Sequence, residues 1–163
     1  MHGGEGRPPL PVISGRALAV CTFAVLQQST PYPLIGTWQL NPLRSHYGGG
    51  AEPRVRETMV CRGEAVVIAC TTESVRPDGR TVTASFMAPD DGTNGPVRGI
   101  EEMDSVKLVR VNSARVDATF SLHGRPVFGY RAQRSTDGKL LTITAVDPVT
   151  RATRQSVIVY DAK

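Results

Sequence analysis

Apolar and polar residues alternate along most of the chain beyond residue 34, which is the period of a β-strand with one buried face. The clearest segment is Arg115–Leu122, where Val116, Ala118 and Phe120 alternate with charged and hydroxyl-bearing residues. A helix would repeat its apolar positions at the helical period instead, and this pattern is missing from the sequence after residue 30. The alternation therefore predicts strands.

Nine segments show this alternation. They are Ile35–Asn41, Arg56–Arg62, Ala65–Val75, Thr81–Ala88, Ser105–Asn112, Arg115–Leu122, Pro126–Arg134, Leu140–Val146 and Arg154–Tyr160. Turn-forming pairs such as Asp78-Gly79 and Asp137-Gly138 separate them, as in tight hairpins. Because successive hairpins place neighbouring strands side by side, the sequence predicts an all-β, lipocalin-like fold. It would be an antiparallel up-and-down β-barrel of about 8–9 strands.

Two segments break the alternation. Residues 42–55 are rich in glycine, proline and arginine, which excludes a helix and predicts a loop over one barrel end. Pro89–Asp104 holds several aspartates and glycines and does not keep the order of a calcium-binding loop. We expect it to be a solvated loop with a short edge strand at Val97–Gly99.

The first thirty residues differ from the rest. Arg7 and Arg16 precede an apolar stretch, Ala17–Leu26, as in an export signal. The predicted division is a signal peptide at 1–30 and one barrel domain at 31–163, with a periplasmic or secreted location. The alternative is that this stretch is a buried first helix or strand. No apolar run reaches the roughly 18 residues of a membrane span.

Composition narrows the classes of partner. The net charge is +4, and the basic residues are spread without a Lys/Arg-rich block or an aromatic–glycine repeat, so we expect no nucleic-acid partner. His46 and His123 lie in turn-like segments without metal-ligand spacing. We therefore expect no metal and no cofactor, and the oligomeric state stays open.

Two cysteines, Cys61 and Cys70, follow the expected signal, and an exported protein favours a disulfide between them. A hairpin that turns at Gly63-Glu64 would instead place them four residues apart along the ladder, roughly 13 Å, which is too far for a disulfide. We expect two buried free thiols, while a longer or bulged turn would permit the bond.

Three stretches carry a family resemblance: Gly36–Pro42, Asp137–Thr144 and Val159–Asp161. Together they resemble small exported bacterial lipocalin-like proteins of calycin type, whose functions are mostly uncharacterised. More distantly, the opening is similar to that of the lipocalin and fatty-acid-binding protein superfamily.

The resemblance implies structural roles. In that superfamily the tryptophan closes the barrel floor and a basic side chain from a late strand lies against it, which implies roles for Gly36 and Trp38. Arg154 is the expected partner of the indole, with Arg151 as the second candidate. The Arg-x-Tyr carboxylate clamp of fatty-acid-binding proteins is missing from the last strand, because Ser156-Val157-Ile158 precede Val159-Tyr160.

The expected function depends on whether the barrel interior is hollow or filled. Small residues on the inward faces either leave a cavity or fit a filled core, and the sequence leaves both open. For a cavity, the function expected is binding of a small, mostly apolar molecule. The expected ligand-binding residues are Tyr130, Phe120, Phe86, Met59 and Phe128. Tyr130 would be the polar anchor, since its neighbour Arg131 points to the opposite face.

Two alternatives remain, and whether the chain is an enzyme stays uncertain. One is a small barrel enzyme of cyclase or isomerase type, for which no catalytic residue is assigned; Glu57 is the best candidate because it shares a face with Met59 and Cys61. A surface charge at the strand end is the simpler interpretation of Glu57. The other alternative is a filled barrel whose loops contact a partner.

Overall fold

The structure is a computed structural model that describes residues 32–49, 51–64 and 66–163, so the expected export signal lies outside the described residues. Ten strands follow one another. They are β1 Gly36–Leu40, β2 Arg56–Glu64, β3 Val67–Val75, β4 Thr81–Pro89, β5 Asp91–Arg98, β6 Ser105–Arg110, β7 Arg115–Leu122, β8 Arg125–Arg134, β9 Leu140–Val146 and β10 Thr153–Ala162. Among these residues there is no helix that is long and apolar enough to cross a membrane.

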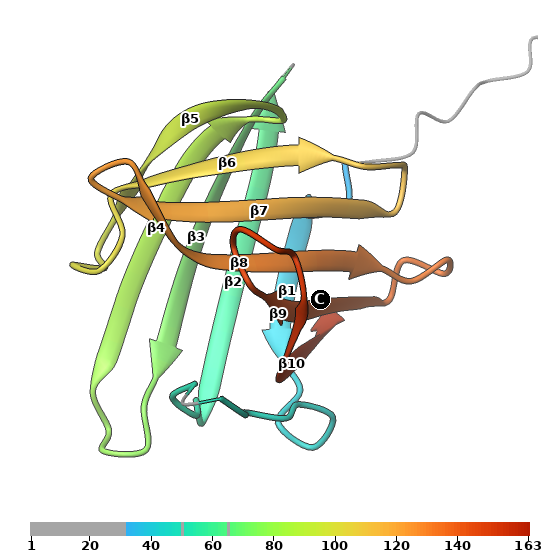
Figure 1. The fold of residues 1–163 in the computed structure, drawn as a ribbon. Helices are drawn as coiled ribbons and strands as arrows, with labels where there is room; N and C mark the ends of the chain where they lie inside the picture. Colours follow the sequence, from blue (N-terminus) through green and yellow to red (C-terminus); the bar gives the residue numbers. More distant parts are fainter. Residues whose placement is uncertain (1–31, 50, 65) are drawn as a thin grey trace, which may run out of the picture.

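The strands form one closed barrel (Figure 1). Each strand pairs antiparallel with its neighbours in sequence, and β1 closes the ring on β10 through Trp38↔Ala162 and Leu40↔Tyr160. Closure satisfies the backbone groups that an open sheet would expose at its edges. The prediction of an antiparallel up-and-down barrel is confirmed, with ten strands rather than eight or nine.

The additional strand is β5, in the segment predicted as a solvated loop. The short strand expected at Val97–Gly99 overlaps the end of β5, but the loop predicted before it was wrong. DGTNGPVR lacks apolar alternation, and the strand forms because its backbone pairs with β6 along most of its length. On its other side β5 pairs with β4 only at Ser85↔Arg98 and Phe86↔Val97. At Gly95 a Cβ atom would lie 1.9 Å from the Met87 carbonyl oxygen, so this close approach requires glycine.

Trp38 closes one end of the barrel. The indole is fully buried and its Nε1 donates to the Leu34 carbonyl at 2.8 Å. Gly36 just before it has a φ of +144°, a conformation that side chains disfavour. The guanidinium of Arg134 lies 5.1 Å from the indole centre and donates to the Ile35 carbonyl at 2.9 Å.

The expected partner of the indole, Arg154, does not reach it. Trp38 pairs with Ala162 at the end of β10, whereas Arg154 lies near the start of that strand and therefore at the opposite end of the barrel. Arg154 pairs there with Asp147 at 3.1 Å. Arg134 takes the role because β8 ends on the same side as Trp38.

The other end of the barrel is crossed by residues 41–55, which we call the connector. Figure 1 shows it running past the end of the barrel where β2 begins. His46 forms a two-way backbone bridge with Val157 of β10, at 2.7 and 2.8 Å. At Gly48 a Cβ atom would meet the Gln155 carbonyl at 2.4 Å, so the connector lies directly against β10.

Cys61 and Cys70 face each other across β2 and β3 and form a disulfide. The expectation of free thiols was wrong because the ladder continues to the pair Glu64↔Val67, so the turn falls beyond Glu64. This shift of the turn brings the two cysteines directly opposite each other. Both are buried on the inner face of the barrel.

Candidate functional site

The half of the barrel nearer the connector is hollow. A cavity of about 440 Å³ lies there, while the half around Trp38 is packed by fully buried side chains such as Leu34, Leu108, Val116 and Leu141. All five residues expected to bind a ligand line the cavity: Tyr130, Phe120, Phe86, Met59 and Phe128. The sequence left a cavity and a filled core open, and the structure has the cavity.

Four aromatic rings form one wall. Phe120 of β7 is central, with its ring centre 5.9 Å from Phe86, 5.9 Å from Phe128 and 5.6 Å from Tyr130. Phe120 and Phe128 are also direct partners in the β7–β8 ladder. Tilted and edge-to-face contacts of this kind hold aromatic side chains in place. The wall therefore offers a broad, apolar and preformed surface.

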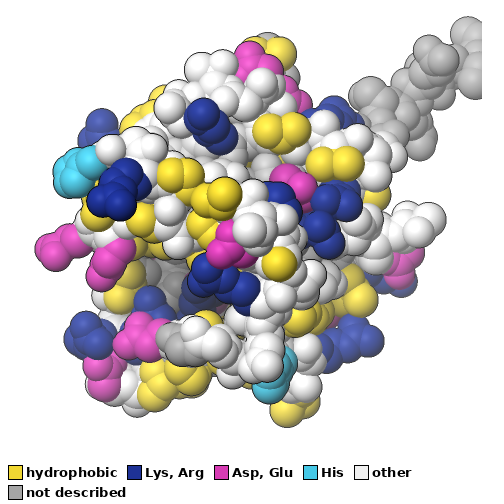
Figure 2. Space-filling view, viewed as in Figure 1, with side chains coloured by type: hydrophobic (Ala, Val, Ile, Leu, Met, Phe, Trp, Pro, Cys, Tyr) yellow, Lys and Arg dark blue, Asp and Glu magenta, His cyan; other side chains and the backbone are white. Residues whose placement is uncertain are grey.

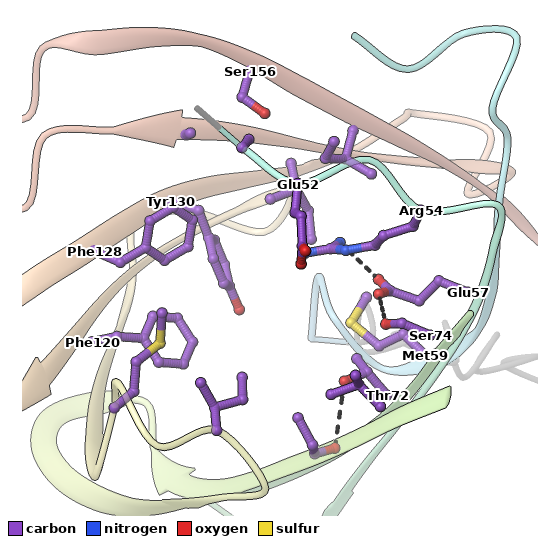
Figure 3. Close-up of a pocket in the computed structure, with 18 of the residues that line it drawn as sticks. Glu52, Arg54, Glu57, Met59, Thr72, Ser74, Phe120, Phe128, Tyr130 and Ser156 are labelled. Carbon is purple, nitrogen blue, oxygen red and sulfur yellow. Dashed lines mark hydrogen bonds and ion pairs between the residues drawn. The ribbon is translucent and has the colours of Figure 1, made fainter. Parts of the chain in front are cut away.

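Tyr130 adds a polar group to this wall. Figure 3 shows its hydroxyl directed into the cavity. In the described part of the chain, no hydrogen bond joins this hydroxyl to another side chain. Burial, with a smaller contribution from Tyr32, raises the pKa of Tyr130 well above its usual value. The hydroxyl therefore stays protonated and can donate to a bound molecule.

Glu57 is the carboxylate of the facing wall and is only 3% exposed. The hydroxyls of Ser74 and Tyr160 donate to it, and Nη1 of Arg54 lies 3.0 Å from its Oε1 (Figure 3). The interpretation of Glu57 as a surface charge was therefore wrong, because it lies on the inward face of β2. Burial, and then the Glu57 charge, raise the pKa of Tyr160.

Arg54 enters the cavity from the connector. Burial works against its charge, but Glu57 and Tyr160 outweigh that effect, so the pKa of the guanidinium is raised. Its Nε is buried without a hydrogen-bond partner among the described residues, and so are the Nε of Arg76 and the hydroxyl of Tyr47. These three residues all line the cavity. The connector side therefore contains buried donors that lack acceptors among the described residues.

A further arginine, Arg154, lies at the rim. Its Nη2 lies 3.1 Å from Asp147, which also accepts from the backbone amides of Thr150 and Val149. These backbone hydrogen bonds, with Arg154 after them, lower the pKa of Asp147 to about 2. Arg154 is therefore part of the cavity rim rather than of the barrel floor.

Three residues of the polar wall were not predicted: Arg54, Ser74 and Tyr160. Arg54 lies in a segment without periodicity, so no pattern indicates where it points. Tyr160 carried a usable signal, because it alternates in phase with Ser156 and Ile158, which are buried with it. The valines between them, Val157 and Val159, lie on the opposite face, and Val157 is half-buried because the connector bridges to it on the outside.

Among the described residues, no group of three or more His, Cys, Asp or Glu side chains could hold a metal ion. Figure 2 shows basic and acidic side chains interspersed over the visible face. Comparison with protein-family models, with curated proteins and with solved structures gives no match. The fold and site therefore define a class by geometry alone: an antiparallel closed β-barrel, compatible with a calycin-like fold, with an internal cavity.

Proposed function

We propose that this chain is an exported lipocalin-like binding protein that holds one small, mostly apolar molecule inside its barrel. The observation that carries the proposal is the cavity of about 440 Å³, with one aromatic wall and a few polar groups opposite. Small-molecule sites are typically concave, preformed and largely apolar, and about 300–1,000 Å³ in size. The cavity has these properties.

Export is part of the same proposal. Disulfides persist in oxidising compartments outside the cytoplasm, and the Cys61–Cys70 bond joins two neighbouring strands of the barrel. The charged and apolar pattern of residues 1–30 supports it independently. Fractionation of the native host, with sequencing of the mature amino terminus, tests it: a cytoplasmic chain that retains residues 1–30 would contradict it.

A second candidate is a small barrel enzyme of cyclase or isomerase type, because Glu57 is a buried carboxylate on the cavity wall. A general base needs a free acceptor position within reach of the proton that it removes. Glu57 already accepts hydrogen bonds from Ser74, Tyr160 and Arg54, which take three of the about four acceptor positions of a carboxylate. We therefore assign Glu57 to the shaping of the site and prefer a binding function.

Native mass spectrometry of the full chain purified from an exporting host tests the binding proposal. We expect a small-molecule adduct that recurs between preparations and is lost on denaturation. A chain that always carries the mass of the polypeptide alone, and that does not take up the neutral apolar dye Nile red, would overturn the proposal.

A further inference from the structure

The charges around the cavity are already balanced. In the part of the chain that the structure describes, each arginine that lines it is paired with one carboxylate of the protein. The pairs are Arg54 with Glu57 at 3.0 Å, Arg76 with Glu52 at 2.7 Å and Arg154 with Asp147 at 3.1 Å. A carboxylate ligand would bring an additional negative charge close to Glu57 and Glu52. A buried charge without a partner is costly, so this arrangement disfavours an anionic ligand.

A cationic ligand is disfavoured for a different reason. The buried carboxylate that it would need is Glu57, whose oxygens accept hydrogen bonds from Ser74 and Tyr160 and pair with Arg54. A ligand ammonium group would have to compete with these donors for the carboxylate and would lie close to the like charge of Arg54. The site therefore favours a ligand without net charge.

Hydrogen-bond donors, in contrast, are in excess. The Nε atoms of Arg54 and Arg76 and the hydroxyl of Tyr47 are buried without acceptors in the described part of the chain. Figure 3 shows the guanidinium of Arg54 and the hydroxyl of Tyr130 reaching into the cavity from facing walls. Arginine can only donate, so an oxygen acceptor is the group that complements this space. An uncharged acceptor near the Tyr130 hydroxyl and the Arg54 guanidinium pairs with these two groups without disturbing the ion pairs.

We infer that the ligand is an uncharged, mostly apolar molecule with a carbonyl oxygen, as in a ketone or an ester. The oxygen lies between Arg54 and Tyr130, and the apolar body packs against Phe86, Phe120 and Phe128. This inference rests on the proposed binding function and adds the chemical class of the ligand.

Four probes with the same chain length test it: methyl undecyl ketone, tridecanoate, tridecylamine and tridecane. Their affinities are measured by displacement of Nile red from the full chain near neutral pH. We expect the ketone to bind about tenfold or more tightly than tridecane, the effect of one hydrogen bond from a buried donor. Tridecanoate and tridecylamine should both bind more weakly than the ketone.

Two variants localise the effect. In Tyr130→Phe the preference for the ketone over tridecane should fall by about threefold to tenfold, while tridecane binds as before. Tyr32→Phe is the matched control, because it removes a buried, unpartnered hydroxyl from a residue that does not line the cavity. It should keep the full preference for the ketone.

The outcomes separate the inference from the proposed function. If Nile red binds and tridecanoate or tridecylamine displaces it best, the inference is overturned and the binding function stands. A ketone that binds no better than tridecane, or a preference that Tyr130→Phe leaves unchanged, overturns the inference in the same way. If neither Nile red nor any probe binds, the binding function itself fails.

Discussion

The Tyr160 hydroxyl donates a hydrogen bond to the Glu57 carboxylate, across 103 positions of sequence. Tyr160 belongs to β10 and Glu57 to β2, and these two strands flank the short strand β1 on either side. The contact therefore spans the seam where the first and last parts of the barrel meet. It shapes the polar wall of the cavity and at the same time joins the two halves of the sheet.

The first prediction concerns this seam. Glu57→Gln removes the negative charge that pairs with Arg54, and it leaves donors from Ser74 and Tyr160 competing for one amide oxygen. We expect a loss of about 1–3 kcal/mol in the free energy of unfolding, measured by urea denaturation. Glu73→Gln on the exposed face of β3 is the control and should change it by less than about 0.5 kcal/mol. Equal effects of the two substitutions would contradict this role.

The barrel floor gives the second prediction. Arg134→Ala removes a cation–π contact with Trp38 and a hydrogen bond to Ile35. Unfolding free energy should fall by about 1–3 kcal/mol, and the tryptophan fluorescence should change because the guanidinium leaves the indole. Arg154→Ala breaks an exposed ion pair and should cost less than about 1 kcal/mol. A larger effect for Arg154→Ala than for Arg134→Ala would contradict the assignment of Arg134 as the basic residue that stabilises the floor.

The disulfide provides a third prediction, which is a count of thiols. The chain has three cysteines, so the unreduced, unfolded full chain should expose one reactive thiol, that of Cys21. Three reactive thiols would refute the bond. Replacing Cys61 and Cys70 together by alanine should lower the unfolding free energy by about 2–3 kcal/mol, as expected for the release of a short loop.

The fourth prediction is a dependence on pH. The pKa of Asp147 is lowered from 3.8 to about 2 in the folded chain, so the unfolded chain takes up the proton first as the pH falls. The contribution of Asp147 to stability is therefore complete above about pH 4 and disappears as the pH falls to about 2. Asp147→Asn should be less stable than the parent chain at pH 5, with the difference vanishing near pH 2. A difference in urea midpoint that stays constant over this range would exclude the linkage.

Much of the barrel follows from local alternation. The strands Arg115–Leu122 and Leu140–Val146 have the predicted bounds, because apolar residues on a single face leave only one orientation toward the core. The strand β5 could not be found in this way, since neighbouring backbones stabilise it rather than its own side chains. One of its glycines, Gly95, which the sequence assigned to a loop, is where β4 comes closest.

The residues of the candidate site differ in the same way: those in regular strands could be predicted, and those in irregular segments could not. Phe86, Phe120, Phe128 and Tyr130 could be assigned to the interior because they alternate within regular strands. Arg54 could not be assigned, because the path of the connector over the barrel end depends on tertiary contacts such as the bridge between His46 and Val157.

Cavity filling tests the central claim most directly. Ala84 lines the cavity, whereas its neighbour Thr83 on β4 is exposed, so Ala84→Phe and Thr83→Phe place the same ring on opposite faces of one strand. Nile red titrations of both variants and of the parent chain are the measurement, with far-ultraviolet circular dichroism to confirm that each is folded. The account predicts that Ala84→Phe lowers the affinity for the dye by about tenfold or more, while Thr83→Phe binds like the parent chain. Unchanged affinity in a folded Ala84→Phe variant would show that the barrel interior is not the binding site.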